Sequence, residues 1–172
     1  MRIKRSRSFL IAATIALCVA TTVAQDQVFN DPTVDYGFTL PSDTWKMVVK
    51  PSATNPNVEY VYGLRNDGYL AVRKIPVAAN AVLSDVVQDE AQSVQFKPGY
   101  VANKDENFSG KLRGSVFNFE YVAASKPMVG RYYFLRSDPT TVYVLRFTGL
   151  KDSMRSIRPQ TDSIARTFGV RK

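Results

Sequence analysis

Apolar side chains recur at every second position along several stretches of this chain, a pattern typical of half-buried β-strands. The alternation is strongest near the C-terminal end, where it predicts strands at Ser115–Ala123, Arg131–Arg136 and Thr141–Thr148. Shorter runs predict earlier strands at Tyr36–Leu40, Trp45–Lys50, Asn57–Gly63, Tyr69–Val77 and Tyr100–Phe108. Links of hairpin length join several of these strands, which favours antiparallel pairing.

One earlier hairpin has a specific expected turn. Asp67-Gly68 suits a two-residue type I′ turn, because both central positions of that turn need a positive φ. The turn would place Tyr60 opposite Ile75 on the neighbouring strand.

Trp45, at the start of its own short strand, is expected to be a core anchor.

Two segments show helical spacing instead. The first predicted helix covers Asn80–Phe96, capped by Asn80 or Ser84 and ended by Lys97-Pro98-Gly99. The second covers Lys151–Phe168, with Pro159 expected to kink or restart it. Since strands dominate, the elements predict an α+β fold, an antiparallel β-sheet flanked by helices.

The period of two sorts the three strong strands into two faces. The main core face is expected to be an aromatic wall that collects Phe117, Phe119, Tyr121, Tyr132, Phe134, Tyr143, Leu145 and Phe147. The other face is mixed and includes Asn118. Four of its polar members form the candidate site: Glu120, Arg131, Tyr133 and Arg146. In the expected register the two arginines are directly opposite each other. Two guanidinium groups there could bind an anion or a carboxylate, and the alternative is a structural charge cluster.

The N-terminus has the pattern of a secretory signal peptide over residues 1–24. Four cations lie within Met1–Arg7, an apolar run covers Phe9–Ala20, and small residues lead to a cleavage site after Ala24. The alternative is an uncleaved anchor, although the apolar run is shorter than the roughly 20 residues that span a bilayer. Residues 25–35 are expected to be a flexible segment, and residues 36–172 a single domain without a stable membrane span.

Composition narrows the chemistry. The chain has 172 residues, a formal charge of +8, no histidine and one cysteine, which falls in the predicted leader. Half of the net charge lies in the leader as well, so the exported domain is only mildly basic. Without histidine the Ser-His-Asp and Cys-His mechanisms are excluded. We therefore expect no catalytic residues, no cofactor and no metal. We also expect no nucleic-acid partner, because no basic stripe interleaved with exposed aromatic residues is present.

The chain resembles the PsbP-like domain family over roughly residues 36–168. The resemblance rests on the Tyr36–Pro41 strand followed by Thr44-Trp45-Lys46, and on Tyr143–Thr148 followed by a helix that ends at Thr167-Phe168. It implies an antiparallel sheet sandwiched between helices, in a small exported accessory protein. The family has no shared catalytic motif, so the resemblance implies no catalytic residue.

These observations predict a non-enzymatic accessory or binding protein of the bacterial cell envelope, periplasmic or secreted, whose partner is a protein, peptide or lipid-like ligand. Two alternatives stay open. One is a structural or assembly subunit of a membrane-associated complex, with a photosystem role less expected because no plastid-type transit peptide is present. The other is an enzyme that uses carboxylate, lysine, serine or tyrosine side chains.

Overall fold

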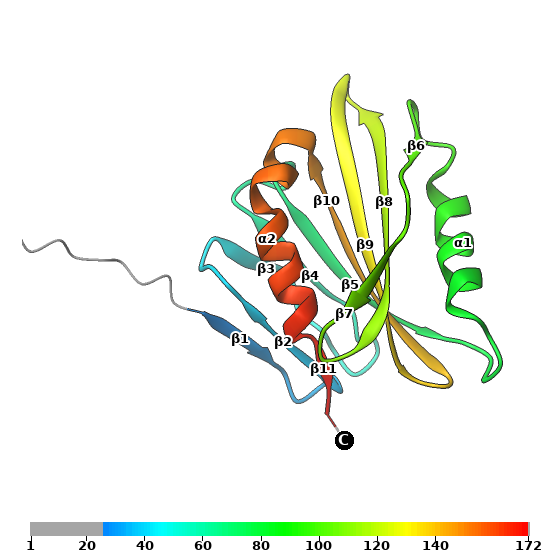
Figure 1. Ribbon diagram of the computed structural model, residues 1–172. Helices are drawn as coiled ribbons and strands as arrows, with labels where there is room; N and C mark the ends of the chain where they lie inside the picture. The colour runs from blue at the N-terminus through cyan, green and yellow to red at the C-terminus, as the bar shows by residue number, and fades with distance from the viewer. Residues whose placement is uncertain (1–25, 172) are drawn as a thin grey trace, which may run out of the picture.

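The computed structural model describes residues 26–171, which build two antiparallel sheets and two helices (Figure 1). The larger sheet has eight strands in the order β3-β4-β5-β10-β9-β8-β6, with β7 also paired to β8. Its members are β3 (Trp45–Val49), β4 (Val58–Tyr62), β5 (Tyr69–Pro76), β6 (Val101–Ala102), β7 (Glu106–Ser109), β8 (Arg113–Ala123), β9 (Lys126–Asp138) and β10 (Thr141–Leu150). The smaller sheet has the order β1-β2-β11, formed by β1 (Gln27–Asn30), β2 (Tyr36–Leu40) and β11 (Gly169–Val170).

The eight-stranded sheet is the middle layer of the molecule. Helix α2 (Lys151–Thr167) and the smaller sheet cover one face, while α1 (Leu83–Val94) packs over β8 and β9 on the other (Figure 1). The α+β class and the flanking helices are therefore confirmed. No helix within residues 26–171 is long and apolar enough to cross a membrane. The predicted leader and its cleavage site at Ala24 lie outside the described residues.

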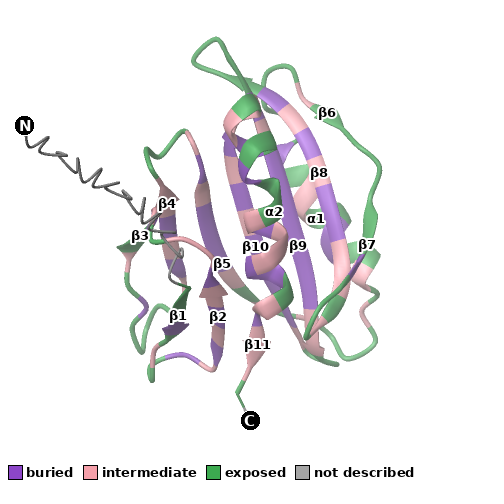
Figure 2. Cartoon of the chain, turned by 60° about the vertical axis from the view of Figure 1, so that its left-hand side comes forward, coloured by how far each residue is buried: buried purple, intermediate pink, exposed green. Residues whose placement is uncertain are grey.

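Both faces of the central sheet are buried, so there are two cores where the sequence predicted one main core face. In Figure 2 the buried colour runs along β5, β9 and β10. The α2 side contains Tyr133, Leu135, Tyr143, Leu145 and Phe147, together with aromatic residues of the smaller sheet. The α1 side contains Phe117, Phe119, Tyr132, Phe134, Val142 and Val144. The predicted aromatic wall is therefore wrong, since its β10 members lie on the opposite face from its β8 and β9 members.

A β-bulge explains this error. The β9–β10 ladder shifts register between Thr141 and Val142, so that Asp138 pairs with Thr141 but Arg136 pairs with Val142. Neighbouring side chains of a strand point to opposite faces. The extra residue, Ser137, therefore moves each later side chain of β10 to the face opposite the one it would have in a hairpin without a bulge. Arg131 consequently pairs with Phe147, not with Arg146 as predicted.

The hairpin turns also differ from expectation. A six-residue loop at positions 63–68, entered through Gly63 with φ 61°, joins β4 to β5 and pairs Tyr60 with Leu70 instead of Ile75. The two-residue turn occurs between β8 and β9, where Ala124 and Ser125 have φ of 48° and 61°. These values fit a type I′ turn, in which both central residues need a positive φ.

The segment predicted to be flexible, residues 25–35, contributes a strand where it is described. Phe29 of β1 is buried against Phe38 of β2, with ring centroids 4.9 Å apart, and its ring also meets Tyr36 and Tyr60. This aromatic burial stabilises β1 against the sheet. The folded domain thus begins before Tyr36.

The helices follow the predicted positions with shorter ends. Helix α1 begins at Leu83 after Val82, without a side-chain cap, so neither Asn80 nor Ser84 caps it. Helix α2 continues through Pro159 and does not restart there. The predicted strand at 100–108 is divided into β6 and β7.

Trp45 is confirmed as a core anchor, because its side chain is 1% exposed and packs against Tyr62 and Phe147. Its indole N–H donates to Oε1 of Gln160 on α2 at 3.0 Å. We expect Trp45→Ala to lower the free energy of unfolding by about 3–5 kcal/mol, the usual cost of such a cavity. Urea denaturation measures this, with Phe96→Ala as control, because Phe96 is 86% exposed. Equal losses in the two variants would contradict the assignment.

Candidate functional site

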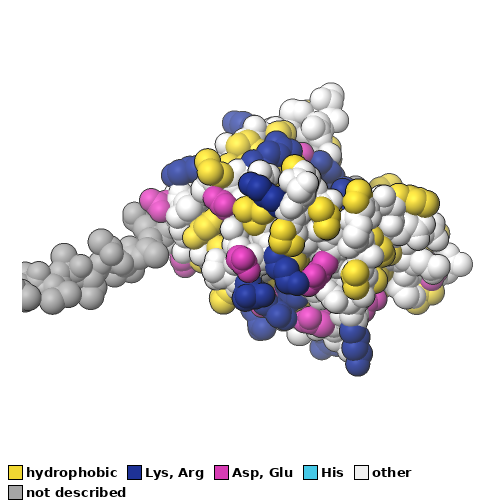
Figure 3. All heavy atoms as spheres, turned by 90° about the horizontal axis from the view of Figure 1, so that it is seen from above, with side chains coloured by type: hydrophobic (Ala, Val, Ile, Leu, Met, Phe, Trp, Pro, Cys, Tyr) yellow, Lys and Arg dark blue, Asp and Glu magenta, His cyan; other side chains and the backbone are white. Residues whose placement is uncertain are grey.

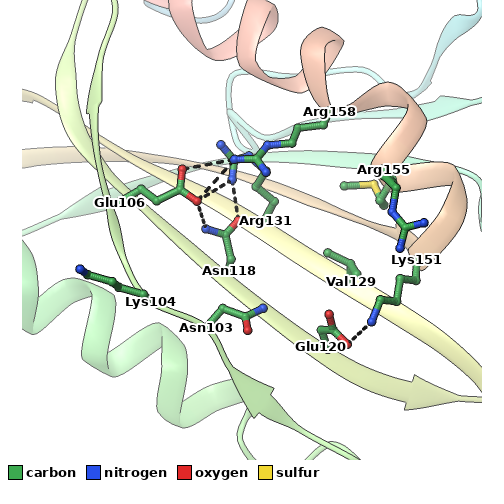
Figure 4. A pocket seen from close by; sticks show the side chains of 11 residues that line it. Asn103, Lys104, Glu106, Asn118, Glu120, Val129, Arg131, Lys151, Arg155 and Arg158 are labelled. Atoms are coloured by element: carbon green, nitrogen blue, oxygen red, sulfur yellow. Dashed lines mark hydrogen bonds and ion pairs between the residues drawn. The ribbon is translucent and has the colours of Figure 1, made fainter.

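A cleft of about 450 Å³ lies between α2 and the β7–β8–β9 part of the sheet, and we call it the α2 cleft (Figure 4). Lys151, Arg155 and Arg158 enter it from α2, while Glu120 and Arg131 enter it from the sheet. Its full lining is Asn103, Lys104, Glu106, Asn118, Glu120, Val129, Arg131, Lys151, Met154, Arg155 and Arg158.

Arg131 is the buried centre of a hydrogen-bond network at one end of this cleft. Its Nε donates to the Tyr133 hydroxyl at 2.7 Å, its Nη1 to Oδ1 of Asn118 at 2.6 Å, and its Nη2 to Oδ1 of Asp162 at 2.9 Å. The Tyr133 hydroxyl in turn donates to the same Asp162 oxygen at 2.5 Å, and the Thr161 hydroxyl lies 3.0 Å from the Tyr133 hydroxyl. Burying a guanidinium group is costly unless it is paired in this way.

This network explains why α2 lies where it does. Asp162 and Thr161 belong to α2, whereas Arg131 and Tyr133 belong to β9, so the bonds join the helix to the sheet. Burial raises the pKa of the Tyr133 phenol, and the hydrogen bond to Asp162 raises it further. The phenol therefore remains a donor at neutral pH, and the donors of Arg131 are largely used within the protein.

The carboxylates of the cleft are also paired with cations. Glu106 lies 3.6 Å from Nη1 of Arg131 and 3.4 Å from Nη2 of Arg158, and it accepts a bond from Asn118 at 3.1 Å. Glu120 accepts a bond from Nζ of Lys151 at 2.7 Å. Among residues 26–171, no cluster of three histidine, cysteine or acidic side chains has a metal-binding arrangement.

Positive charge remains after these pairs are formed. The lining holds five cations against two carboxylates. Lys104 forms no ion pair with a described residue, and Arg155 meets only the exposed Asp152 of its own helix at 3.6 Å. Exposed pairs of this kind contribute little. Figure 3 shows Lys and Arg side chains gathered near the middle of the face seen from above, with acidic side chains among them.

The predicted four-residue site is divided between the two faces of the sheet. Glu120, Arg131 and Tyr133 lie on the α2 side, in or beside the cleft. Arg146 lies on the α1 side, where its guanidinium group bonds to Glu90 of α1. The prediction that Arg131 and Arg146 form a double-guanidinium site is therefore wrong, and the register change at the β9–β10 bulge is the cause.

No protein-family model and no curated protein matches this sequence. Among solved structures, cyanobacterial PsbP (CyanoP) of Synechocystis is similar, with 13% identity and a TM-score of 0.58 over 91% of this chain and 98% of that one. The Ran-binding protein Mog1p of Saccharomyces cerevisiae has 10% identity and a TM-score of 0.60 over 86% and 96%. LpqN of Mycobacterium tuberculosis, involved in cell envelope biogenesis, has 15% identity and a TM-score of 0.56 over 86% and 91%.

The chain has a PsbP-like fold. The resemblance seen in the sequence is confirmed at this level. Identities of 10–15% show shared architecture only, and one fold can serve many functions. The function of this PsbP-like domain therefore has to be argued from its own side chains.

Sequence reasoning missed most of the α2 cleft in this PsbP-like domain. Lys151, Arg155, Arg158 and Asp162 recur every three or four residues and so share one side of α2. That spacing is visible in the sequence, but only the apolar side of the helix was used to place it. Asn118 was recognised as a member of the mixed face, but its bond to Arg131 depends on the register of two long strands.

Removing the Tyr133 hydroxyl tests whether the network is structural. We expect Tyr133→Phe to lower the free energy of unfolding by about 1–3 kcal/mol, because Nε of buried Arg131 loses its acceptor. The neighbouring Tyr132→Phe is the control, since the Tyr132 hydroxyl bonds to no described residue; it should change stability far less. Chemical denaturation compares the two variants, and an equal effect would rule out the structural role.

Proposed function

We propose that this protein is a non-enzymatic accessory protein of a bacterial cell envelope, exported by its N-terminal leader, that binds an acidic segment of a partner protein in the α2 cleft. The observation that carries the proposal is the uncompensated positive charge of the cleft. Lys104 on one wall and Arg155 on the other are the cations left for a ligand.

The spacing along α2 favours an extended ligand. Lys151, Arg155 and Arg158 cover about 10 Å of helix, from the rise of about 1.5 Å per residue. Same-side side chains of an extended peptide recur about every 7 Å. An extended peptide can therefore place carboxylates along this side of α2, where Arg155 is the cation without a partner in the cleft, while Val129 and Met154 offer apolar contact.

Other observations support the remaining parts of the proposal. The signal-peptide pattern of residues 1–24 supports export. A structural neighbour is involved in cell envelope biogenesis and another is by name a Ran-binding protein, which supports an envelope role and a protein partner. The absence of histidine from the sequence, with the cleft carboxylates engaged by cations, supports an accessory rather than a catalytic role.

A peptide pair tests the binding site. The probe is a fluorescent peptide of alternating glycine and glutamate, and its neutral partner has glutamine in place of glutamate. We expect the acidic peptide to bind at low salt, and the double variant Lys104→Glu/Arg155→Glu to weaken it about tenfold or more, because both free cations become acids. Fluorescence anisotropy measures the affinity.

The control variant is Lys46→Glu/Arg113→Glu, which makes the same charge change at exposed positions outside the cleft. Equal weakening by the two double variants would mean general charge attraction and would contradict the site.

Chemical conversion of the bound peptide, detected by mass spectrometry, would contradict the accessory role. A mature N-terminus other than Gln25 in the periplasmic fraction would contradict cleavage after Ala24.

A second candidate, an assembly subunit of a membrane-associated complex, is favoured by one observation. Val28 of β1 and Met47 and Val48 of β3 are exposed apolar side chains at the free edges of the two sheets. Val28 and Met47 line a hollow of about 520 Å³ between these edges. Clustered apolar exposure of this kind is a common feature of protein contact surfaces.

A further inference from the structure

A second cleft opens on the other face of the eight-stranded sheet, beside the part that α1 covers. Its volume is about 240 Å³, and we call it the tyrosine cleft. Tyr121 and Tyr132 line it from β8 and β9, Arg73 and Arg146 from β5 and β10, and Lys97 from the segment that follows α1. No residue of α1 itself is part of the lining.

Three polar groups of this cleft have no partner in the protein. Neither the Tyr132 nor the Tyr121 hydroxyl bonds to a described residue, although the two side chains are only 6% and 9% exposed as a whole. Nη2 of Arg146 bonds to Glu90, but its Nε is buried without a hydrogen-bond partner. Buried polar groups are normally paired, and each exception calls for an explanation. A ligand that supplies several oxygen atoms would provide one.

The phenols are available as hydrogen-bond donors over the physiological range. Burial raises the pKa of Tyr132 to about 12, although nearby Arg146 works in the opposite direction. Burial also raises the pKa of Tyr121. Both hydroxyl groups therefore remain protonated at neutral pH, and each can donate one bond and accept another.

The charge of the cleft favours an anionic group beside the aromatic rings. Nζ of Lys97 lies 4.8 Å from the centroid of the Tyr121 ring, and the guanidinium carbon of Arg146 lies 5.9 Å from that of Tyr132. Arg73 is neutralised by Glu59 at 2.8 Å and Arg146 pairs with Glu90, whereas Lys97 forms no ion pair with a described residue. A carboxylate near Lys97 would therefore meet uncompensated positive charge, with further guanidinium donors of Arg146 beside it.

We propose that the tyrosine cleft binds a sugar ring that carries a carboxylate, a ligand separate from the acidic segment proposed for the α2 cleft. The carboxylate binds Arg146 and Lys97, and the ring hydroxyls bond to the hydroxyl groups of Tyr121 and Tyr132. The side chain of Arg146 is 30% exposed, so the ligand can reach the guanidinium group. The cleft is smaller than the roughly 300–1,000 Å³ of sites for drug-sized ligands, so it holds one ring.

Three small probes separate the parts of this proposal. Glucuronate has ring hydroxyls together with a carboxylate. Glucose has the hydroxyls without the carboxylate, and benzoate has a ring and a carboxylate without hydroxyls. Isothermal titration of the purified protein is expected to show glucuronate binding about tenfold more tightly than either of the others, because only glucuronate satisfies both sets of groups. Equal or weaker binding of glucuronate would overturn the proposal.

Conservative variants locate the binding. We expect Tyr132→Phe and Arg146→Lys each to weaken glucuronate binding about fivefold or more, since one hydroxyl or the planar guanidinium donors are lost while the charge is kept. Tyr100→Phe and Arg113→Lys are the matched controls, because neither residue lines the cleft. Unchanged affinity in the first pair, or equal loss in the controls, would place the ligand elsewhere and overturn the assignment. Neither result depends on the acidic-peptide experiment.

Discussion

The burial of strand β9 on both of its faces is the constraint on which the rest of this structure depends. Every residue from Gly130 to Leu135 is buried, although neighbouring side chains of a strand point in opposite directions. The strand therefore needs a covering layer on each side. Because Arg131 lies within this run, its guanidinium group needs partners as well, and Asp162 of α2 and Asn118 of β8 provide them.

This two-sided burial separates the polar chemistry of the protein into two places. On the α2 side, Arg131 is the centre of a network of paired groups, and positive charge remains at the rim of the cleft. Arg146, one strand away, points to the α1 side, where it pairs with Glu90 and borders buried tyrosines. The inner part of each network stabilises a helix against the sheet, while the unsatisfied charges and hydroxyl groups at the edges are available for recognition. The two proposed binding surfaces thus lie on opposite faces of one sheet.

The sequence was sufficient for the fold class, the approximate positions of most strands, both helices and the role of Trp45, since these depend on local periodicity. It was insufficient for the faces, because alternation cannot distinguish two faces that are both apolar. The single residue Ser137 in the β9–β10 bulge then reversed the side on which Arg146 lies. The partners of Arg131 on α2 could not be paired with it from the sequence, since that contact requires the position of a helix relative to the sheet.

A pair of double-mutant cycles tests most directly the claim that Arg131 and Arg146 belong to opposite faces. The account predicts that Arg146→Met and Glu90→Gln couple by about 0.5–3 kcal/mol in unfolding free energy, because the two groups are in contact. It predicts that Arg131→Met and Arg146→Met are additive within about 0.5 kcal/mol, because they share no partner. Strong coupling between the two arginines, with none between Arg146 and Glu90, would contradict the account.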